Sequence, residues 1–169
     1  MTTNNDMIII RKANANDVES IIKMWKEFMK IHDAIVMEKN PLLKQHIRLK
    51  KDSRESFQKF IKKQIKSTDS LVSIAEIDGK PIGYALSFIK RNIPVFAMDK
   101  IGYISDMYIE KEYNGMGIGS KLKNEAVRWF KKKNIKNISL IVFHDNEHAR
   151  KVYEKWGFFN YSIEMRKGI

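Results

Sequence analysis

Three glycines at alternating positions carry the clearest chemical signal in the chain: Gly115, Gly117 and Gly119. They follow an apolar run that ends at Ile109 and come just as a helical pattern begins at Ile118. Glycine lets the main chain bend sharply, and the free N–H groups at a helix N-terminus attract anions. The pattern indicates a phosphate-binding loop. The structural alternative is a tight turn that only joins a strand to a helix.

The spacing of these glycines excludes two common phosphate-binding motifs. The dinucleotide fingerprint requires a third glycine at position 120 or 122, where the chain has Ser120 and Leu122. The Walker loop requires glycine directly before Lys-Ser or Lys-Thr, whereas here Ser120 precedes Lys121. A different phosphate-binding segment is therefore expected.

The absence of cysteine restricts the chemistry further. The 169 residues contain no Cys, so disulfides, Cys-ligated zinc and a cysteinyl acyl-enzyme are excluded. His144 and His148 are four residues apart, but a strand end and a helix start are expected between them, so no metal site is expected. Acyl chemistry must run directly from donor to acceptor or through another nucleophile.

Two kinds of pattern define the elements that position these residues. Runs of β-branched or alternating residues predict strands at 8–13, 71–77, 82–89, 101–109, 138–143 and 158–165. Apolar residues at spacings of three and four predict helices at 18–29, 57–65, 118–130 and 149–156. Asn16 with Glu19 has the form of a capping box before the first helix, and Asp78-Gly79 predicts a hairpin turn.

The order of these elements predicts an α/β (α+β) fold around a single mixed sheet. At ~150 residues per domain, the length predicts one domain over residues 1–169. The first residues lack the pattern of a signal peptide, and the apolar run at 7–10 is shorter than the ~20 residues that span a bilayer. We expect a soluble, cytoplasmic protein that does not bind membranes.

The stretch from Ile104 to Leu122 resembles the acetyl-CoA-binding segment of the GNAT family of N-acetyltransferases. The core motif of that family is Arg/Gln-x-x-Gly-x-Gly/Ala after a strand. Gly117 and Gly119 match its two glycines, while Asn114 stands at the Arg/Gln position. Asn is shorter and uncharged, so the resemblance implies that diphosphate binding relies on main-chain N–H groups.

A second stretch, from Asn146 to Phe158, looks like the Asn-x-x-Ala-x-x-x-Tyr-x-x-x-Gly-Phe box of the same family. Together the two boxes imply the GNAT fold, a mostly antiparallel twisted sheet of about six to seven strands flanked by about four helices. They also imply an acetyl-CoA-dependent N-acetyltransferase that transfers the acetyl group directly to a primary amine in a ternary complex. The identity of the amine stays open, from a polyamine, an amino-sugar antibiotic or a free amino acid to a protein N-terminus or lysine.

The resemblance assigns most of the co-substrate contacts to the strand and loop before the third helix. The residues it places at acetyl-CoA are Met107, Tyr108, Ile109, Asn114, Gly115, Met116, Gly117, Ile118, Gly119, Ser120, Asn146 and Tyr153. Family members commonly use a tyrosine at the place that Tyr153 occupies in this chain to protonate the departing thiolate. The alternative is a core aromatic residue on an amphipathic helix.

The general base and the acceptor pocket are less well defined by sequence. Asp106 stands eight residues before Asn114, where some relatives carry an acidic base or ammonium anchor, and a structural charge is the alternative. His32 and Asp33 are expected at the end of the first helix, a region that lines the acceptor pocket in relatives. Surface polarity at a helix end would explain them equally.

The charge balance leaves two further functions open. The 32 Lys and Arg against 20 Asp and Glu give a net charge of +12, concentrated at 39–66 and 121–136. A nucleic-acid-binding module could use these residues, but neither stretch shows the interleaved pattern of aromatic residues that stacks bases, so this partner is not expected. A non-catalytic CoA-binding sensor is the other alternative. The expected strand at 158–165 offers a pairing edge for a possible homodimer.

Overall fold

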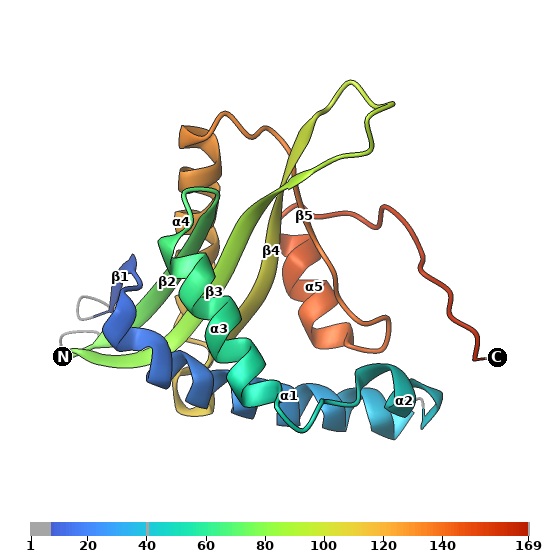
Figure 1. The fold of residues 1–169 in the computed structure, drawn as a ribbon, viewed down its shortest axis with the longest axis horizontal. Coiled ribbons are helices and arrows are strands. Elements are labelled where there is room, and N and C mark those ends of the chain that lie inside the picture. Colours follow the sequence, from blue (N-terminus) through green and yellow to red (C-terminus); the bar gives the residue numbers. More distant parts are fainter. Residues whose placement is uncertain (1–7, 40, 169) are drawn as a thin grey trace.

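The computed structural model describes residues 8–39 and 41–168, and it contains one five-stranded sheet with helices on both faces (Figure 1). The strands are β1 (Ile9–Lys12), β2 (Ser70–Ile77), β3 (Lys80–Arg91), β4 (Lys100–Ile109) and β5 (Ile138–Leu140). The α-helices are α1 (Val18–Lys39), α2 (Lys44–Ile47), α3 (Ser53–Lys66), α4 (Ile118–Lys132) and α5 (Glu147–Lys155). Short 3-10 turns cover Ala15–Asp17, Pro41–Leu43 and Lys111–Tyr113.

The strands follow one another across the sheet in sequence order, from β1 to β5. The first three pairings are antiparallel, and β4 and β5 run parallel because α4 crosses between them. The predicted mixed, mostly antiparallel sheet is therefore confirmed. The Asp78-Gly79 hairpin is confirmed as well, with both residues at positive φ (50° and 76°), as a tight two-residue turn requires.

The strand and helix counts differ from the sequence prediction. The described part of the chain has five strands where six to seven were predicted, because residues 158–165 are extended but pair with no strand. It has five α-helices where about four were predicted, because the four-residue helix α2 follows α1. The predicted strand at 138–143 is also shorter, since β5 ends at Leu140.

The capping box before α1 lies two residues earlier than predicted, although α1 begins at Val18 as predicted. The capping box joins Asn14 and Asp17 rather than Asn16 and Glu19, because a 3-10 turn precedes the helix. The Asn14 side chain accepts a hydrogen bond from the Asn16 N–H, and the Asn14 N–H donates to Asp17. Asp17 also pairs with Arg11 of β1 at 2.8 Å, which ties the helix start to the edge of the sheet.

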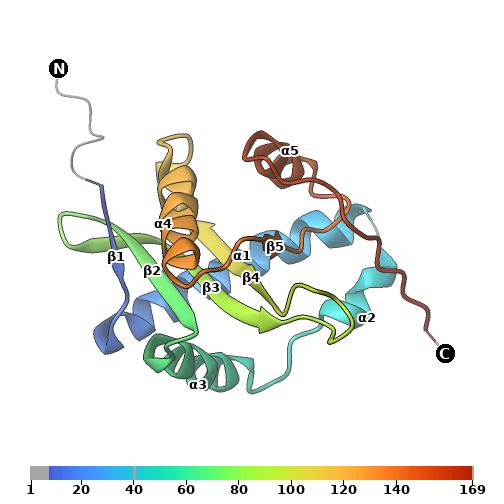
Figure 2. The ribbon, with the colours of Figure 1, turned by 90° about the horizontal axis from the view of Figure 1, so that it is seen from above.

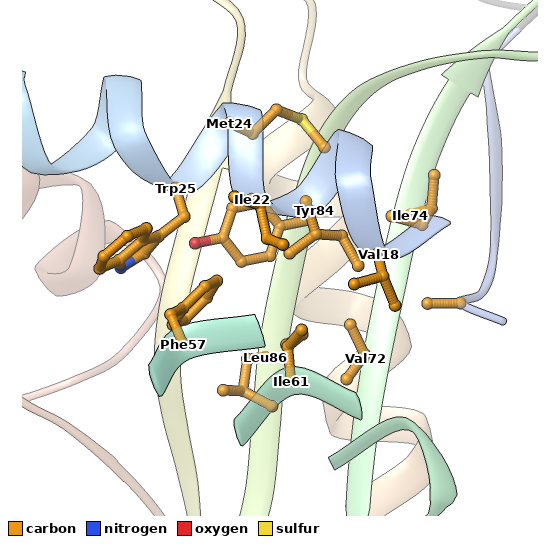
Figure 3. Close-up of a cluster of buried hydrophobic side chains, with 12 residues drawn as sticks. Val18, Ile22, Met24, Trp25, Phe57, Ile61, Val72, Ile74, Tyr84 and Leu86 are labelled. Atoms are coloured by element: carbon orange, nitrogen blue, oxygen red, sulfur yellow. The ribbon is translucent and has the colours of Figure 1, made fainter. Parts of the chain in front are cut away.

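Helices α1 and α3 cover one face of the sheet. Their apolar side chains pack on Val72, Ile74, Tyr84 and Leu86 of β2 and β3, as Figure 3 shows. The rings of Trp25 and Phe57 stack with their centroids 4.3 Å apart, joining the two helices. Tyr84 is fully buried in this layer.

Helix α4 covers the opposite face. Its buried residues Ile118, Leu122, Ala126 and Phe130 recur every four positions, which forms the predicted apolar stripe. Phe130 lies directly against Gly102 of β4, where a Cβ atom would come within 2.7 Å of the ring. This close contact fixes α4, and the loop before it, against β4.

Candidate active site

Strand β4 separates from β5 after a short stretch of pairing. The two strands pair only from Gly102 to Ile104 of β4, whereas the pairing of β4 with β3 continues to Ile109. Among the described residues, the second half of β4 has no strand beside it on the β5 side. An extended ligand could therefore form main-chain hydrogen bonds along this edge.

The direction of the main-chain groups on this edge follows from the ladder with β3. Glu110 donates its N–H to the carbonyl of Ile82, and alternate residues of a strand point the same way. Tyr108 therefore pairs with β3, while the N–H and C=O groups of Met107 and Ile109 face the open edge. Of the three strand residues predicted to contact the co-substrate, Met107 and Ile109 have main-chain groups that face this open edge.

The glycine loop joins this edge to α4. Gly115 and Gly117 have φ of +82° and +74°, and Gly117 is the N-cap of the helix. No atom lies within 4 Å of where their side chains would begin, so the outer face of the loop is open. The first helical hydrogen bond runs from Lys121 to the Gly117 carbonyl. The N–H groups of 118–120 thus precede the helical ladder, as an anion site at a helix N-terminus requires.

Helix α5 reaches the same place from the other side. A Cβ on Gly119 would lie 3.5 Å from both Ile109 of β4 and Trp156, the residue that follows α5. The side chain of Ile118 is buried and anchors the loop in the core. The strand edge, the loop and the end of α5 therefore converge, which brings the two sequence boxes together.

Tyr153 lies on α5 and Asn146 is the N-cap of that helix, as predicted. The Asn146 side chain accepts a hydrogen bond from the Ala149 N–H at 3.2 Å, so its oxygen caps the helix and its amide nitrogen is left as a donor. The ring of Tyr153 contacts Trp156 and Phe158 at centroid distances of 5.7 and 6.2 Å. Burial raises the pKa of Tyr153, which keeps the phenol protonated at neutral pH.

A bulge in β4 determines where Asp106 points. The register with β3 shifts at this place, since Leu86 pairs with Asp106 and Ser87 with Ile104, which leaves Ser105 outside the ladder. An extra residue reverses the alternation of side chains beyond it. Asp106 and Tyr108 consequently face α1, although simple alternation from Ile104 would place them towards α4.

Asp106 is held by two hydroxyl groups. Ser105 donates at 2.8 Å and Tyr84 at 3.3 Å to its two carboxylate oxygens. Burial raises the pKa of Asp106, and the two hydrogen bonds and nearby His32 act in the opposite direction. A buried carboxylate with a raised pKa can accept a proton from an ammonium group or bind it as an ion pair.

His32 and Asp33 were predicted at the end of the first helix. This prediction was wrong, because α1 continues to Lys39 and both residues lie inside it. The ring of His32 contacts Phe143 edge-on at 4.4 Å and Phe28 at 5.5 Å. Burial lowers the pKa of His32, opposed by Asp33 and Asp106. The Nδ1 atom of His32 and the Oδ1 atom of Asp33 are buried without a hydrogen-bond partner. Unpaired buried polar atoms are costly, which marks this position as a candidate ligand contact.

A shallow groove lies between α1 and the end of β4. Its volume is about 570 Å³, and its lining residues are Glu27, Tyr108, Glu110, Lys111 and Glu112. The ring of Tyr108 meets Phe28 of α1 at 6.4 Å, which closes one side. Three carboxylates line this groove in a chain of net charge +12. Lys80 partly balances two of them, at 3.5 Å from Glu110 and 3.6 Å from Glu112.

Sequence reasoning missed Tyr84, Ser105 and Phe143. In the sequence, Tyr84 is indistinguishable from the other apolar residues of its strand. No local sequence pattern indicates the bulge that orients Ser105. Phe143 belonged to a predicted strand, and only the fold brings it against His32.

Within the described residues, neither a group of metal ligands nor a membrane-spanning helix is evident. Across residues 8–39 and 41–168, no three His, Cys, Asp or Glu side chains are grouped as metal ligands would be. No helix within those ranges combines the length and apolarity that crossing a bilayer requires.

Comparison with known proteins identifies the family. A sequence model of the acetyltransferase (GNAT) family matches residues 31–158. The chain belongs to the GNAT family. An uncharacterized N-acetyltransferase of Archaeoglobus fulgidus is 33% identical over 82 residues, which are 48% of this chain and 55% of that protein. The chain spans about half the length of the curated relatives it matches.

Solved structures of this GNAT member's fold cover nearly the whole chain. A tetramutant of the BH1408 protein from Bacillus halodurans has a TM-score of 0.77 at 20% identity, with 95% of this chain and 99% of that one aligned. A predicted acetyltransferase from Clostridium acetobutylicum, determined with acetyl-CoA, has a TM-score of 0.74 at 22% identity, with 96% of each chain aligned. At these identities the likeness concerns the fold.

Proposed function

We propose that this chain is an acetyl-CoA-dependent N-acetyltransferase that acts as one domain and transfers the acetyl group directly to a primary amine in a ternary complex. The observation that carries the proposal is the open edge of β4, which leads directly into a glycine loop at the N-terminus of α4. Family membership supports the reaction class. Without cysteine, direct transfer is the simplest route.

The loop and the strand edge bind the two halves of the co-substrate in this proposal. The N–H groups of the loop, from Gly115 to Ser120, hold the diphosphate, and Asn114 contributes little because it is short and exposed. The main-chain groups of Met107 and Ile109 pair with the pantetheine arm as a neighbouring strand would. The free amide nitrogen of Asn146 is a further donor to that arm.

Asp106 and Tyr153 move the protons. Asp106 takes a proton from the substrate ammonium, and the neutral nitrogen attacks the thioester carbonyl carbon. The C–N bond forms, the C–S bond breaks, and the thiolate takes its proton from the Tyr153 hydroxyl. The nitrogen loses its second proton as the amide forms, which restores the Tyr153 hydroxyl through solvent, and Asp106 releases its own proton to solvent. The raised pKa of Tyr153 keeps that proton in place until the thiolate, a base of similar strength, develops.

His32 and Asp33 contribute to the acceptor pocket in this proposal. Their unpaired buried atoms offer hydrogen bonds to polar groups of the amine substrate, beside the carboxylate of Asp106. The groove lined by Glu27, Glu110 and Glu112 would attract a polyamine, although the net charge of +12 on the whole chain repels one. Polyamines therefore stay among the acceptors to be tested, with amino sugars, amino acids, peptide N-termini and lysine.

The test is release of the CoA thiol from acetyl-CoA in the presence of a panel of these amines. We expect one class to be accepted, and Tyr153→Phe to lower kcat by at least about tenfold, the low end for loss of a general acid. Tyr161→Phe removes the same atom from a tyrosine that is 85% exposed, and it serves as the matched control. CoA binding without turnover of any amine would instead favour the sensor.

A further inference from the structure

A second cavity lies between the end of β1, the start of α1 and the end of α3. Its volume is about 640 Å³. Its lining residues are Lys12, Ala13, Asn14, Ala15, Val18, Lys62, Ile65 and Lys66. Figure 2 shows this corner of the molecule, where the start of α1 (blue) and the end of α3 (green) lie side by side.

This cavity is separate from the pocket around Asp106. Val18 lines the cavity at the first residue of α1, whereas His32, which lies near Asp106, is far along the same helix. At 1.5 Å per residue, the helix places these two positions roughly 20 Å apart. A ligand in the cavity would therefore not compete with the acceptor amine.

The walls of the cavity are mostly apolar. Ala13 and Val18 are buried and belong to the core beneath it, and Ile65 packs against the same core. Asn14 is the one uncharged polar residue of the lining, and its side chain already accepts a hydrogen bond from the Asn16 N–H. None of the lining residues is aromatic. Such walls favour an aliphatic group over a hydrated ion or a planar ring.

Three lysines complete the lining, and all three are exposed. Lys12 ends β1, and Lys62 and Lys66 are one turn apart on α3. Across residues 8–39 and 41–168, none of the three belongs to an ion pair. The carboxylates that lie next to the lining along the chain are already paired with arginines: Asp17 with Arg11 and Glu19 with Arg54. The cavity therefore carries positive charge that the protein does not compensate.

We propose that this cavity binds a phosphate monoester with an aliphatic body, in which the three lysines hold the phosphate and the apolar walls bury the chain. A phosphate monoester carries a charge of about −1.5 to −2 at neutral pH, so it matches several ammonium groups better than a carboxylate does. Lysine binds phosphate as a point charge, so the three side chains need no fixed bidentate geometry. The volume of the cavity is typical of small-molecule sites, roughly 300–1,000 Å³.

The test is calorimetric binding of hexyl phosphate to the full chain at low salt, with CoA in excess so that the glycine loop is occupied. We expect hexyl phosphate to bind one to one. It should bind at least about tenfold more tightly than inorganic phosphate, which lacks the chain, and than hexanoate, which carries less charge. This site does not depend on the proposed reaction, and it can fail while that reaction stands.

Two double variants of α3 separate the cavity from the general positive charge of the chain. Lys62→Gln with Lys66→Gln should weaken the binding of hexyl phosphate at least about tenfold, because two of the three charges are lost. The matched control is Lys59→Gln with Lys63→Gln, which removes the same charge from two exposed lysines of α3 outside the lining. We expect the control to keep the affinity within about threefold of the original.

Vesicles that contain phosphatidic acid distinguish a free ligand from a lipid headgroup, since both carry a phosphate monoester. Binding of hexyl phosphate without binding of the vesicles, which we expect, assigns a soluble ligand. Vesicle binding that Lys62→Gln with Lys66→Gln abolishes and the control keeps would assign a lipid to the same site. The proposal is overturned if neither probe binds, if hexyl phosphate binds no more tightly than inorganic phosphate or hexanoate, or if both double variants weaken binding equally.

Discussion

The two hydroxyl groups on Asp106 allow a quantitative test of its role as the base. A hydrogen bond to a charged group contributes roughly 1.5–3 kcal/mol, and roughly 1.4 kcal/mol corresponds to one pH unit. The 2.8 Å bond from Ser105 has the length of a good O–H···O bond, whereas the 3.3 Å bond from Tyr84 is long and therefore weaker. Ser105→Ala should thus have the larger effect.

The sign follows from the state that the hydroxyls stabilise. Both donate to the ionised carboxylate, so the loss of either raises the pKa of Asp106, and the enzyme then needs a higher pH to ionise its base. We expect the acid limb of kcat/KM to move to higher pH by about one unit in Ser105→Ala and by about half a unit or less in Tyr84→Phe. Asp106→Asn should lose roughly 10²-fold or more of kcat.

The assay is the initial rate of thiol release against pH, with the accepted amine and Tyr161→Phe as the control. Circular dichroism at each pH confirms that the variants stay folded. An acid limb that stays in place in Ser105→Ala, or moves to lower pH, would refute the assignment of Asp106 as the base.

Three further outcomes follow from the structure. Gly102→Ala places a methyl group 2.7 Å from the buried ring of Phe130 and should lower the free energy of unfolding by about 1–3 kcal/mol in denaturant titration, with partial recovery when Phe130→Leu is added. The methyl group of Gly117→Ala would meet no atom, but the φ of +74° at this position costs an alanine about 1–2 kcal/mol. Calorimetry should therefore show weaker CoA binding, and an unchanged affinity would contradict the role of the loop. Arg11 holds the pKa of Asp17 below its usual 3.8, so the Asp17→Asn variant should be less stable than the original chain near neutral pH. Urea titrations should show this difference in stability shrinking as the pH falls below 3.8, and a constant difference would exclude the ion pair as its cause.

Local patterns predicted much of the fold and the loop. The repeat of buried residues on α4, the Asp78-Gly79 turn and the glycine loop each depend on neighbours along the chain, so the sequence carries them directly. The same holds for the cap that Asn146 provides to α5. These features needed no knowledge of distant contacts.

The remaining features depend on contacts between distant segments. The bulge at Ser105 sets the face on which Asp106 lies, and nothing in the β4 sequence distinguishes it from regular alternation. The length of α1 decides whether His32 and Asp33 are at a helix end or inside the helix, and α1 continues six residues beyond the predicted end at Asp33. The tail at 158–165 has the alternation of a strand, but it pairs with no strand of the described residues, because alternation alone does not decide where a strand pairs.

The most direct test of the central claim is equilibrium binding of CoA to the full chain, measured by calorimetry beside pantetheine, which lacks the diphosphate. If the loop at Gly115–Ser120 holds that diphosphate, CoA should bind one to one, acetyl-CoA should compete with it, and pantetheine should bind at least about 100-fold more weakly, since the loop contacts are lost with the two phosphates. A folded chain that binds neither compound, or binds both equally, would contradict the account.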